Sequence, residues 1–166
     1  MLAKTLKDLY ENGKYQEVLD QLTQKDNQGA FASLPEDEQI ECLYYKSRSL
    51  GFLGKLEDAL QVATAARAND VSLNDKTLTL ALLIAQLYAL WKLGRLDDVL
   101  EPIKEGNSII EALTAKERQT GALWVALFEN VQGNIYYTLG DMDKTLKHWK
   151  QSLAIREDIG NLQDIA

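Results

Sequence analysis

The sequence predicts an all-α protein, a right-handed α-solenoid of about four antiparallel helix pairs. The first observation is a repeat, because glycine recurs 40 to 46 residues apart, at Gly13, Gly54, Gly94 and Gly140. A period of that length is typical of supersecondary units that must stack on their neighbours to bury their apolar faces. The second observation is that only two prolines occur and that strand-like alternation between turn dipeptides is absent. Both observations favour stacked helices.

A shared register of apolar residues after each glycine supports the repeat. Two positions after it come Tyr15, Leu56, Leu96 and Met142; six after it come Leu19, Leu60, Leu100 and Leu146; nine after it come Leu22, Ala63, Ile103 and Trp149. These offsets share one face of an α-helix. We therefore expect the helix that follows each glycine to bury this face.

The helices can be placed along the chain from this register and from local start signals. We expect them over residues 2–12, 15–25, 34–52, 56–69, 74–93, 96–112, 115–139 and 142–159. Capping-box spacing of Ser33 with Glu36, and of Thr114 with Glu117, predicts two of the starts, and a weaker version spans residues 72–75. Pro102 should kink or loosen the sixth helix, because proline removes an internal hydrogen bond. Gly160 favours a helix end.

These residues resemble the tetratricopeptide repeat (TPR) family, in which each unit is a pair of antiparallel helices. The fourth unit matches best, through Gly133, Tyr136, Gly140, Leu146 and Trp149. The spacing is closest to the long, roughly forty-residue prokaryotic-type variant, whereas the standard unit has about 34 residues. The resemblance implies one TPR-like array, residues 1–166, with units at roughly 1–32, 33–72, 73–113 and 114–160. Residues 161–166 then begin a further helix or a cap, and we favour a fragment of a longer protein.

Charge and composition exclude several classes of function. The chain of 166 residues has a formal net charge of −7, and its lysines and arginines are scattered, which argues against nucleic acid as a partner. The most apolar stretch is too short to span a bilayer, so we expect no membrane partner. Lone Cys42 suits a reducing compartment, and no segment at the start looks like a signal peptide. We therefore expect a cytoplasmic protein.

The resemblance places the first helix of each unit on the concave side of the stack, where partners bind. Four offsets before the glycines form one stripe along these helices. Its partner-binding candidates, with one neighbour, are Tyr44, Tyr45, Arg48, Phe52, Tyr88, Trp91, Lys92, Asn130, Asn134 and Tyr137. Aromatic and arginine anchors are enriched at binding hot spots, and the cations suit a carboxylate. The same aromatic residues at helical spacing also fit an inter-repeat core, and the sequence leaves this alternative open.

Catalysis is not expected, and neither is a cofactor or a metal. His148 is the only histidine, and with Cys42 it cannot make an ordinary zinc site. We expect His148 to be a solvated or partly packed helix residue. The expected function is a scaffold that binds a peptide or protein segment in its concave groove. The alternatives are a ligand- or peptide-sensing regulatory array that controls an attached effector domain, and self-association through the terminal repeat.

Overall fold

The computed structural model describes residues 1–68 and 75–165, with side chains up to residue 160. In these residues it contains α-helices and short 3₁₀ turns and no strand, so the predicted all-α class is confirmed. Four pairs of consecutive helices contact each other: α1 (Leu2–Glu11) with α2 (Tyr15–Asn27), α3 (Glu36–Phe52) with α4 (Leu56–Arg67), α5 (Thr77–Lys92) with α6 (Leu100–Ala112), and α8 (Ala122–Thr138) with α9 (Met142–Ile165). The shorter elements are η1 (Phe31–Ser33), η3 (Leu96–Asp98) and α7 (Ala115–Thr120).

The four repeated glycines form the same turn inside each helix pair. Their φ angles lie between 73° and 80°, in the left-handed region that side chains with a Cβ avoid. At the second pair, the amide of Gly54 donates to the carbonyl of Gly51 at 3.1 Å, and the next amide, of Lys55, donates to Leu50 at 2.9 Å. At each of the other three glycines, the amide of the glycine and the amide of the next residue donate the same two hydrogen bonds. This arrangement is the Schellman motif, which ends one helix and redirects the chain into the next.

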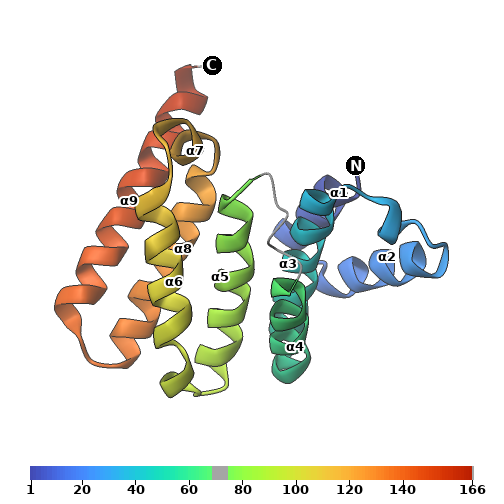
Figure 1. The fold of residues 1–166 in the computed structure, drawn as a ribbon, viewed down its shortest axis with the longest axis horizontal. Helices are drawn as coiled ribbons and strands as arrows, with labels where there is room; N and C mark the ends of the chain where they lie inside the picture. The colour runs from blue at the N-terminus through green and yellow to red at the C-terminus, as the bar shows by residue number, and fades with distance from the viewer. Residues whose placement is uncertain (69–74, 166) are drawn as a thin grey trace.

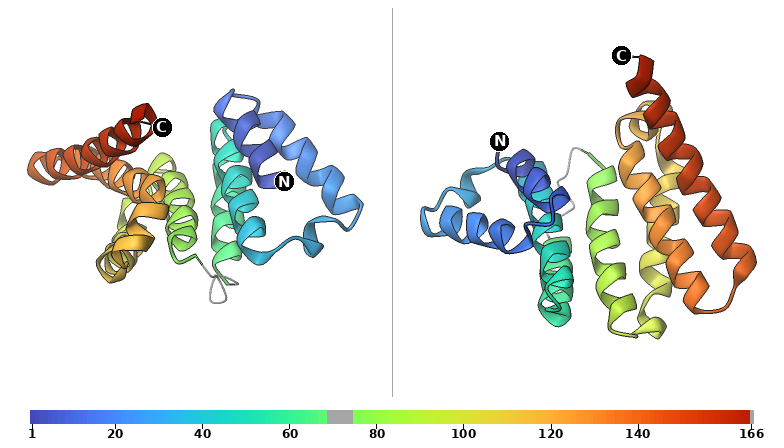
Figure 2. Two further views of the ribbon diagram at one scale, coloured as in Figure 1. Left: turned by 90° about the horizontal axis from the view of Figure 1, so that it is seen from above. Right: turned by 180° about the vertical axis from the view of Figure 1, so that it is seen from behind.

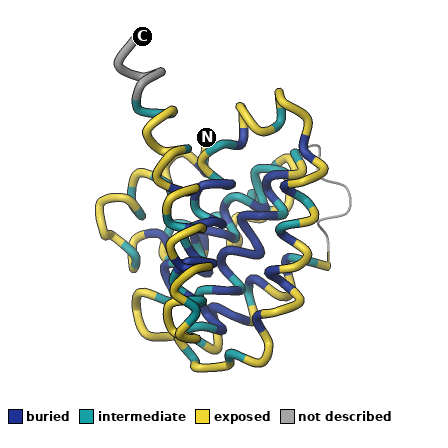
Figure 3. Tube along the Cα trace, turned by 90° about the vertical axis from the view of Figure 1, so that its left-hand side faces the viewer, coloured by how far each residue is buried: buried dark blue, intermediate teal, exposed yellow. Residues whose placement is uncertain are grey.

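Helix α5 lies in the middle of the molecule, with α1–α4 on one side and α6–α9 on the other (Figures 1 and 2). It contacts α3 and α4 of the preceding pair and α8 of the following pair. Its residues 80–85 are at most 2% exposed. A helix that is apolar on all sides is expected to be surrounded by protein. Figure 3 shows the same distribution, with buried segments along the middle of the stack and exposed segments at its margins.

The buried face of the second helices agrees with the prediction at offset nine in the first three pairs, where Leu22, Ala63 and Ile103 are at most 6% exposed, but differs from it at offset six. The residues five places after each glycine are Val18, Ala59, Val99 and Thr145, and all are at most 2% exposed. Those six places after it diverge, since Leu60 is 9% exposed but Leu100 and Leu146 are 58% and 46% exposed. The prediction is therefore wrong for offset six in the last two pairs and for offset two in the last pair, where Met142 is 48% exposed.

Helix boundaries near Pro102, Gly121 and Gly160 differ from the sequence prediction. Helix α6 begins at Leu100 after the 3₁₀ turn η3, so Pro102 lies in its first turn, where an N–H has no intrahelical partner. The sixth helix, predicted over residues 96–112, is therefore interrupted before Pro102 and not kinked in its middle. The helix predicted at 115–139 is divided into α7 and α8 at Gly121, where an added Cβ would lie 2.3 Å from Thr77 Cγ2. The predicted stop at Gly160 is also wrong, because α9 continues to Ile165.

One of the predicted capping boxes forms and another does not. The Thr114 hydroxyl accepts from the Glu117 amide at 3.1 Å, and the Glu117 carboxylate accepts from the Thr114 amide at 2.8 Å. Ser33 instead donates to the carbonyl of Ala30, and α3 begins after Pro35 without a side-chain cap. The weaker signal at residues 72–75 falls mostly outside the described residues.

Candidate functional site

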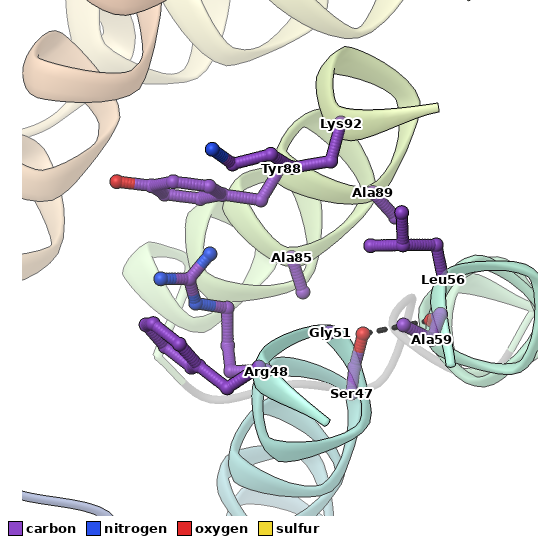
Figure 4. A pocket seen from close by; sticks show the side chains of 10 residues that line it. Ser47, Arg48, Gly51, Leu56, Ala59, Ala85, Tyr88, Ala89 and Lys92 are labelled. Atoms are coloured by element: carbon purple, nitrogen blue, oxygen red, sulfur yellow. Dashed lines mark hydrogen bonds between the residues drawn. The ribbon is translucent and has the colours of Figure 1, made fainter. Parts of the chain in front are cut away.

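A small pocket opens between α3, the start of α4 and α5 (Figure 4). It has a volume of about 190 Å³ and is lined by Ser47, Arg48, Gly51, Phe52, Leu56, Ala59, Ala85, Tyr88, Ala89 and Lys92. Four of these residues, Arg48, Phe52, Tyr88 and Lys92, are candidates from the sequence. The structure therefore brings together two cations and two aromatic rings from α3 and α5, which are separated in the sequence by α4.

The hollow exists because small side chains stand where the three helices meet. Gly51, Ala59, Ala85 and Ala89 line it, and a Cβ added to Gly51 would meet no atom within 4 Å. The buried Ser47 hydroxyl donates to the Ala59 carbonyl at 2.7 Å and so joins α3 to α4 beside the pocket. The helices around the pocket are thus fixed relative to each other, while the space between them is left open by the small side chains.

Arg48 is the most constrained of the polar residues at this pocket. Its guanidinium carbon lies 3.4 Å from the centre of the Tyr88 ring and 5.3 Å from that of Phe52. Figure 4 shows the guanidinium facing the Tyr88 ring. Its Nε donates to the hydroxyl of Tyr10 at 3.3 Å, which connects it to the first helix pair. Cation–π contacts of this kind are worth about 0.5–2 kcal/mol each and orient the cation.

The positive charge of Arg48 is not paired with a carboxylate among the side chains that the structure describes, in residues 1–68 and 75–160. Burial raises the pKa of Tyr10 and Tyr44, although Arg48 acts against this shift, so both tyrosines are neutral at physiological pH. An arginine remains protonated under these conditions. The site therefore carries a partly buried, uncompensated positive charge beside an apolar hollow.

A cluster of aromatic rings supports this arrangement from the first helix pair. Tyr15 stacks on Phe52, with ring centres 4.6 Å apart and planes 4° apart. Tyr10 touches the rings of Tyr15, Phe52, Tyr44 and Tyr45. Tyr15 was not among the sequence candidates; the available signal was its aromatic ring at an offset where the other units have leucine or methionine.

The remaining candidates of the second and third units lie outside the pocket. Tyr44 and Tyr45 are only 4% and 5% exposed and belong to the core, where burial raises the pKa of each hydroxyl. Trp91 donates through Nε1 to Thr138 on α8 at 2.9 Å, and its ring lies 4.4 Å from Lys92 Nζ. Trp91 thus connects α5 to the last helix pair at the edge of the site.

The candidates on α8 form a separate patch. Asn134 accepts a hydrogen bond from Trp149 Nε1 at 3.1 Å, and Tyr137 stacks on the same ring at 5.8 Å. Tyr137 is 58% exposed, whereas Asn130 is half-buried. Partner contact through these three residues stays a prediction.

A second, more polar cavity of about 650 Å³ lies between α6, α8 and α9, and the sequence did not indicate it. Glu129 and His148, both buried, are among its lining residues, with Glu129 Oε2 2.5 Å from His148 Nδ1. The Tyr136 ring stacks on His148 at 5.5 Å. His148 is therefore neither solvated nor partly packed as expected; the signal for this pair was a glutamate where the equivalent residues, Leu43 and Leu83, are apolar.

The structure describes no group of three or more metal-ligating side chains in residues 1–68 and 75–160. None of the described helices combines the length and the apolar character needed to cross a membrane. Comparison of the chain with protein-family models, with curated proteins and with solved structures gave no match.

Proposed function

We propose that this chain is a short right-handed α-solenoid of the TPR type that binds a peptide or protein segment carrying a carboxylate. The solenoid is supported by four helix pairs with the same glycine turn and by the contacts of α3 with α1 and α5, and of α5 with α8. In this assignment, the first helices of successive pairs face the partner and the second helices face away. The protein is a binding scaffold, and its role is not catalytic.

The unpaired charge of Arg48 is the observation that carries the proposal. Partial burial of a cation without a counter-ion is unfavourable, and aromatic rings offset only part of that free energy. A carboxylate of a partner would accept from the guanidinium, and hydrogen bonds to charged groups contribute about 1.5–3 kcal/mol each. Because Arg48 is already held by Tyr10 and Tyr88, little side-chain entropy is lost on binding.

The surroundings of Arg48 define the rest of the ligand. The apolar side chains of Leu56, Ala59 and Ala89 line the hollow next to the guanidinium, and the exposed Lys92 stands at its rim. The pocket of about 190 Å³ admits one side chain and no folded element. The ligand is therefore an extended segment with an acidic group adjacent to an apolar side chain.

Binding of a synthetic peptide library tests this proposal directly. Short peptides that pair an apolar residue with aspartate, glutamate or a free C-terminus are compared with versions in which each carboxylate is replaced by an amide. We expect the acids to bind and the amides to bind at least about tenfold more weakly, because one charge-assisted hydrogen bond is lost. The change in tryptophan fluorescence, with Trp91 at the edge of the pocket, reports binding.

Two variants separate the charge from the hollow. Arg48→Met removes the charge while it keeps the length of the side chain, and Gly51→Leu fills the hollow, where an added Cβ meets nothing within 4 Å. Each should weaken binding at least about tenfold by hot-spot precedent. Gly160→Leu is the matched control, a helical glycine with equally open space in α9. Acids and amides of equal affinity, or full binding by both pocket variants, would contradict the proposal.

A further inference from the structure

The last helix pair leaves an apolar face uncovered on α9. Met142, Leu146 and Leu153 are 48%, 46% and 56% exposed. They are spaced four and seven residues apart, so they lie in one stripe along the helix. We name Met142, Leu146 and Leu153 the α9 stripe. Thr145, His148 and Ser152 pack toward α8, and the stripe lies on the adjoining face of α9.

The equivalent face of the second helix pair is covered by the next pair. Leu56 and Leu60 on α4 occupy the same positions after their glycine as Met142 and Leu146 do on α9. Leu60 is only 9% exposed, Leu56 is half-buried, and α4 packs against α5. The α9 stripe therefore corresponds to the surface of α4 through which the second helix pair packs against the third.

We infer that the occupant is a second copy of this chain, which pairs with the first through α9 around a two-fold axis. A head-to-tail contact would need a complementary apolar surface on the first helix pair. Of the large hydrophobic side chains described there, only Met1 is exposed. The α9 stripe itself is the surface that can cover another α9 stripe, and such a same-to-same contact closes at two copies.

The charges beside the stripe fit an antiparallel pairing of the two helices. Asp143 and Lys150 are seven residues apart and flank the stripe on the side away from α8. Neither forms an ion pair with the side chains described in its own chain. When two α9 helices run antiparallel with Leu146 near the axis, Asp143 of each copy comes beside Lys150 of the other. The arrangement places two symmetry-related pairs of opposite charges along one edge of the contact, the edge away from α8.

Molar mass as a function of protein concentration tests the pairing. In sedimentation equilibrium the parent chain should approach twice the monomer mass and grow no further. Leu146→Lys should raise the dissociation constant at least about tenfold, because a charge replaces an apolar side chain in the centre of the contact. Leu100→Lys is the matched control: Leu100 occupies the same position after its glycine, is 58% exposed and lies on α6. Circular dichroism verifies that both variants remain folded.

Charge reversal tests the two-fold geometry separately. Asp143→Lys should weaken the dimer, because it places lysines opposite each other, and adding Lys150→Asp to the same chain should restore the parent affinity. A parent that remains monomeric at every concentration overturns the inference. It is equally overturned by growth beyond two copies, by Leu100→Lys weakening association as much as Leu146→Lys, or by a double charge variant that stays as weak as the single one.

Discussion

Alanine substitutions at Gly51 and Gly54 should change the free energy of unfolding in opposite directions. The two glycines are three residues apart in the same turn, and a Cβ added at either would meet no atom within 4 Å. Side-chain sterics are therefore matched, and only the backbone differs. Gly51 lies inside α3, whereas Gly54 has a φ of 79°.

The magnitudes follow from this backbone difference. Alanine in place of a helical glycine stabilises by up to about 1 kcal/mol. A left-handed residue with a Cβ is unfavourable by about 1–2 kcal/mol relative to glycine. We therefore expect Gly51→Ala to raise the stability and Gly54→Ala to lower it, with a gap of about 2 kcal/mol between them. For a chain of this size, about 2–4 °C corresponds to each kcal/mol, so the Tm values should differ by about 4–8 °C.

Urea unfolding followed by circular dichroism measures the gap. Gly54→Asn is an informative third variant, because asparagine tolerates the left-handed region better than alanine and should fall between Gly54→Ala and the parent. Equal stability of Gly51→Ala and Gly54→Ala would refute the reasoning. It would mean that the glycine turn does not require a positive φ, and the structural basis of the repeat would be lost with it.

Further substitutions test the packing, the helix end signals and the pH dependence of stability. Gly106→Ala should lower the free energy of unfolding by about 1–3 kcal/mol, measured by thermal unfolding. The reason is that the added Cβ would lie 2.0 Å from Cζ of the fully buried Phe128. Unchanged stability would contradict that contact. Thr114→Ala should lower the stability by about 1 kcal/mol, because it removes the capping box. Ser33→Ala removes no cap and should leave the stability nearly unchanged. Equal effects of the two substitutions would refute the assignment of the caps. Burial raises the pKa of the Cys42 thiol from 9.0 to about 12, so the unfolded chain ionises first and stability should fall as pH rises above about 9. The stability of Cys42→Ala should fall less steeply over this range, and an unchanged slope would exclude Cys42 as the cause.

The helix pairs could be predicted because their signals are local. A glycine at each turn, followed by the same register of apolar residues, depends only on the conformation of a few neighbouring residues. Pro102 and Gly121 show where local reasoning is insufficient. The proline was read correctly as a helix breaker, but whether it breaks the middle or begins a new helix depends on where the preceding 3₁₀ turn ends. At Gly121, where the helix is divided, the backbone lies against Thr77 of α5, a contact between residues far apart in the sequence.

The buried faces could be predicted only approximately, because a shift of one residue rotates a helix by about 100°. In the third helix pair, offset five is buried as in the other pairs, and offset six is exposed. Val99 is buried there and Leu100 is 58% exposed, although leucine at that offset is repeated in all four units. An apolar side chain that recurs in the sequence is thus insufficient evidence that its neighbours cover it.

Several residues of the candidate site could be predicted from the sequence. Which charged side chains are paired in the fold could not be predicted. Two partly or fully buried charged side chains in this chain have different surroundings. Glu129 is only 7% exposed, and His148 from the next helix lies 2.5 Å from it. Arg48 has aromatic rings and one tyrosine hydroxyl, and no carboxylate among the described residues pairs with it. Pairing depends on which distant segments the fold brings together, so neither case could be read from spacing. An aliphatic residue at position 48 would avoid the unfavourable burial of a charge. Under the proposed function, a carboxylate that arrives with a partner accounts for an arginine at this position.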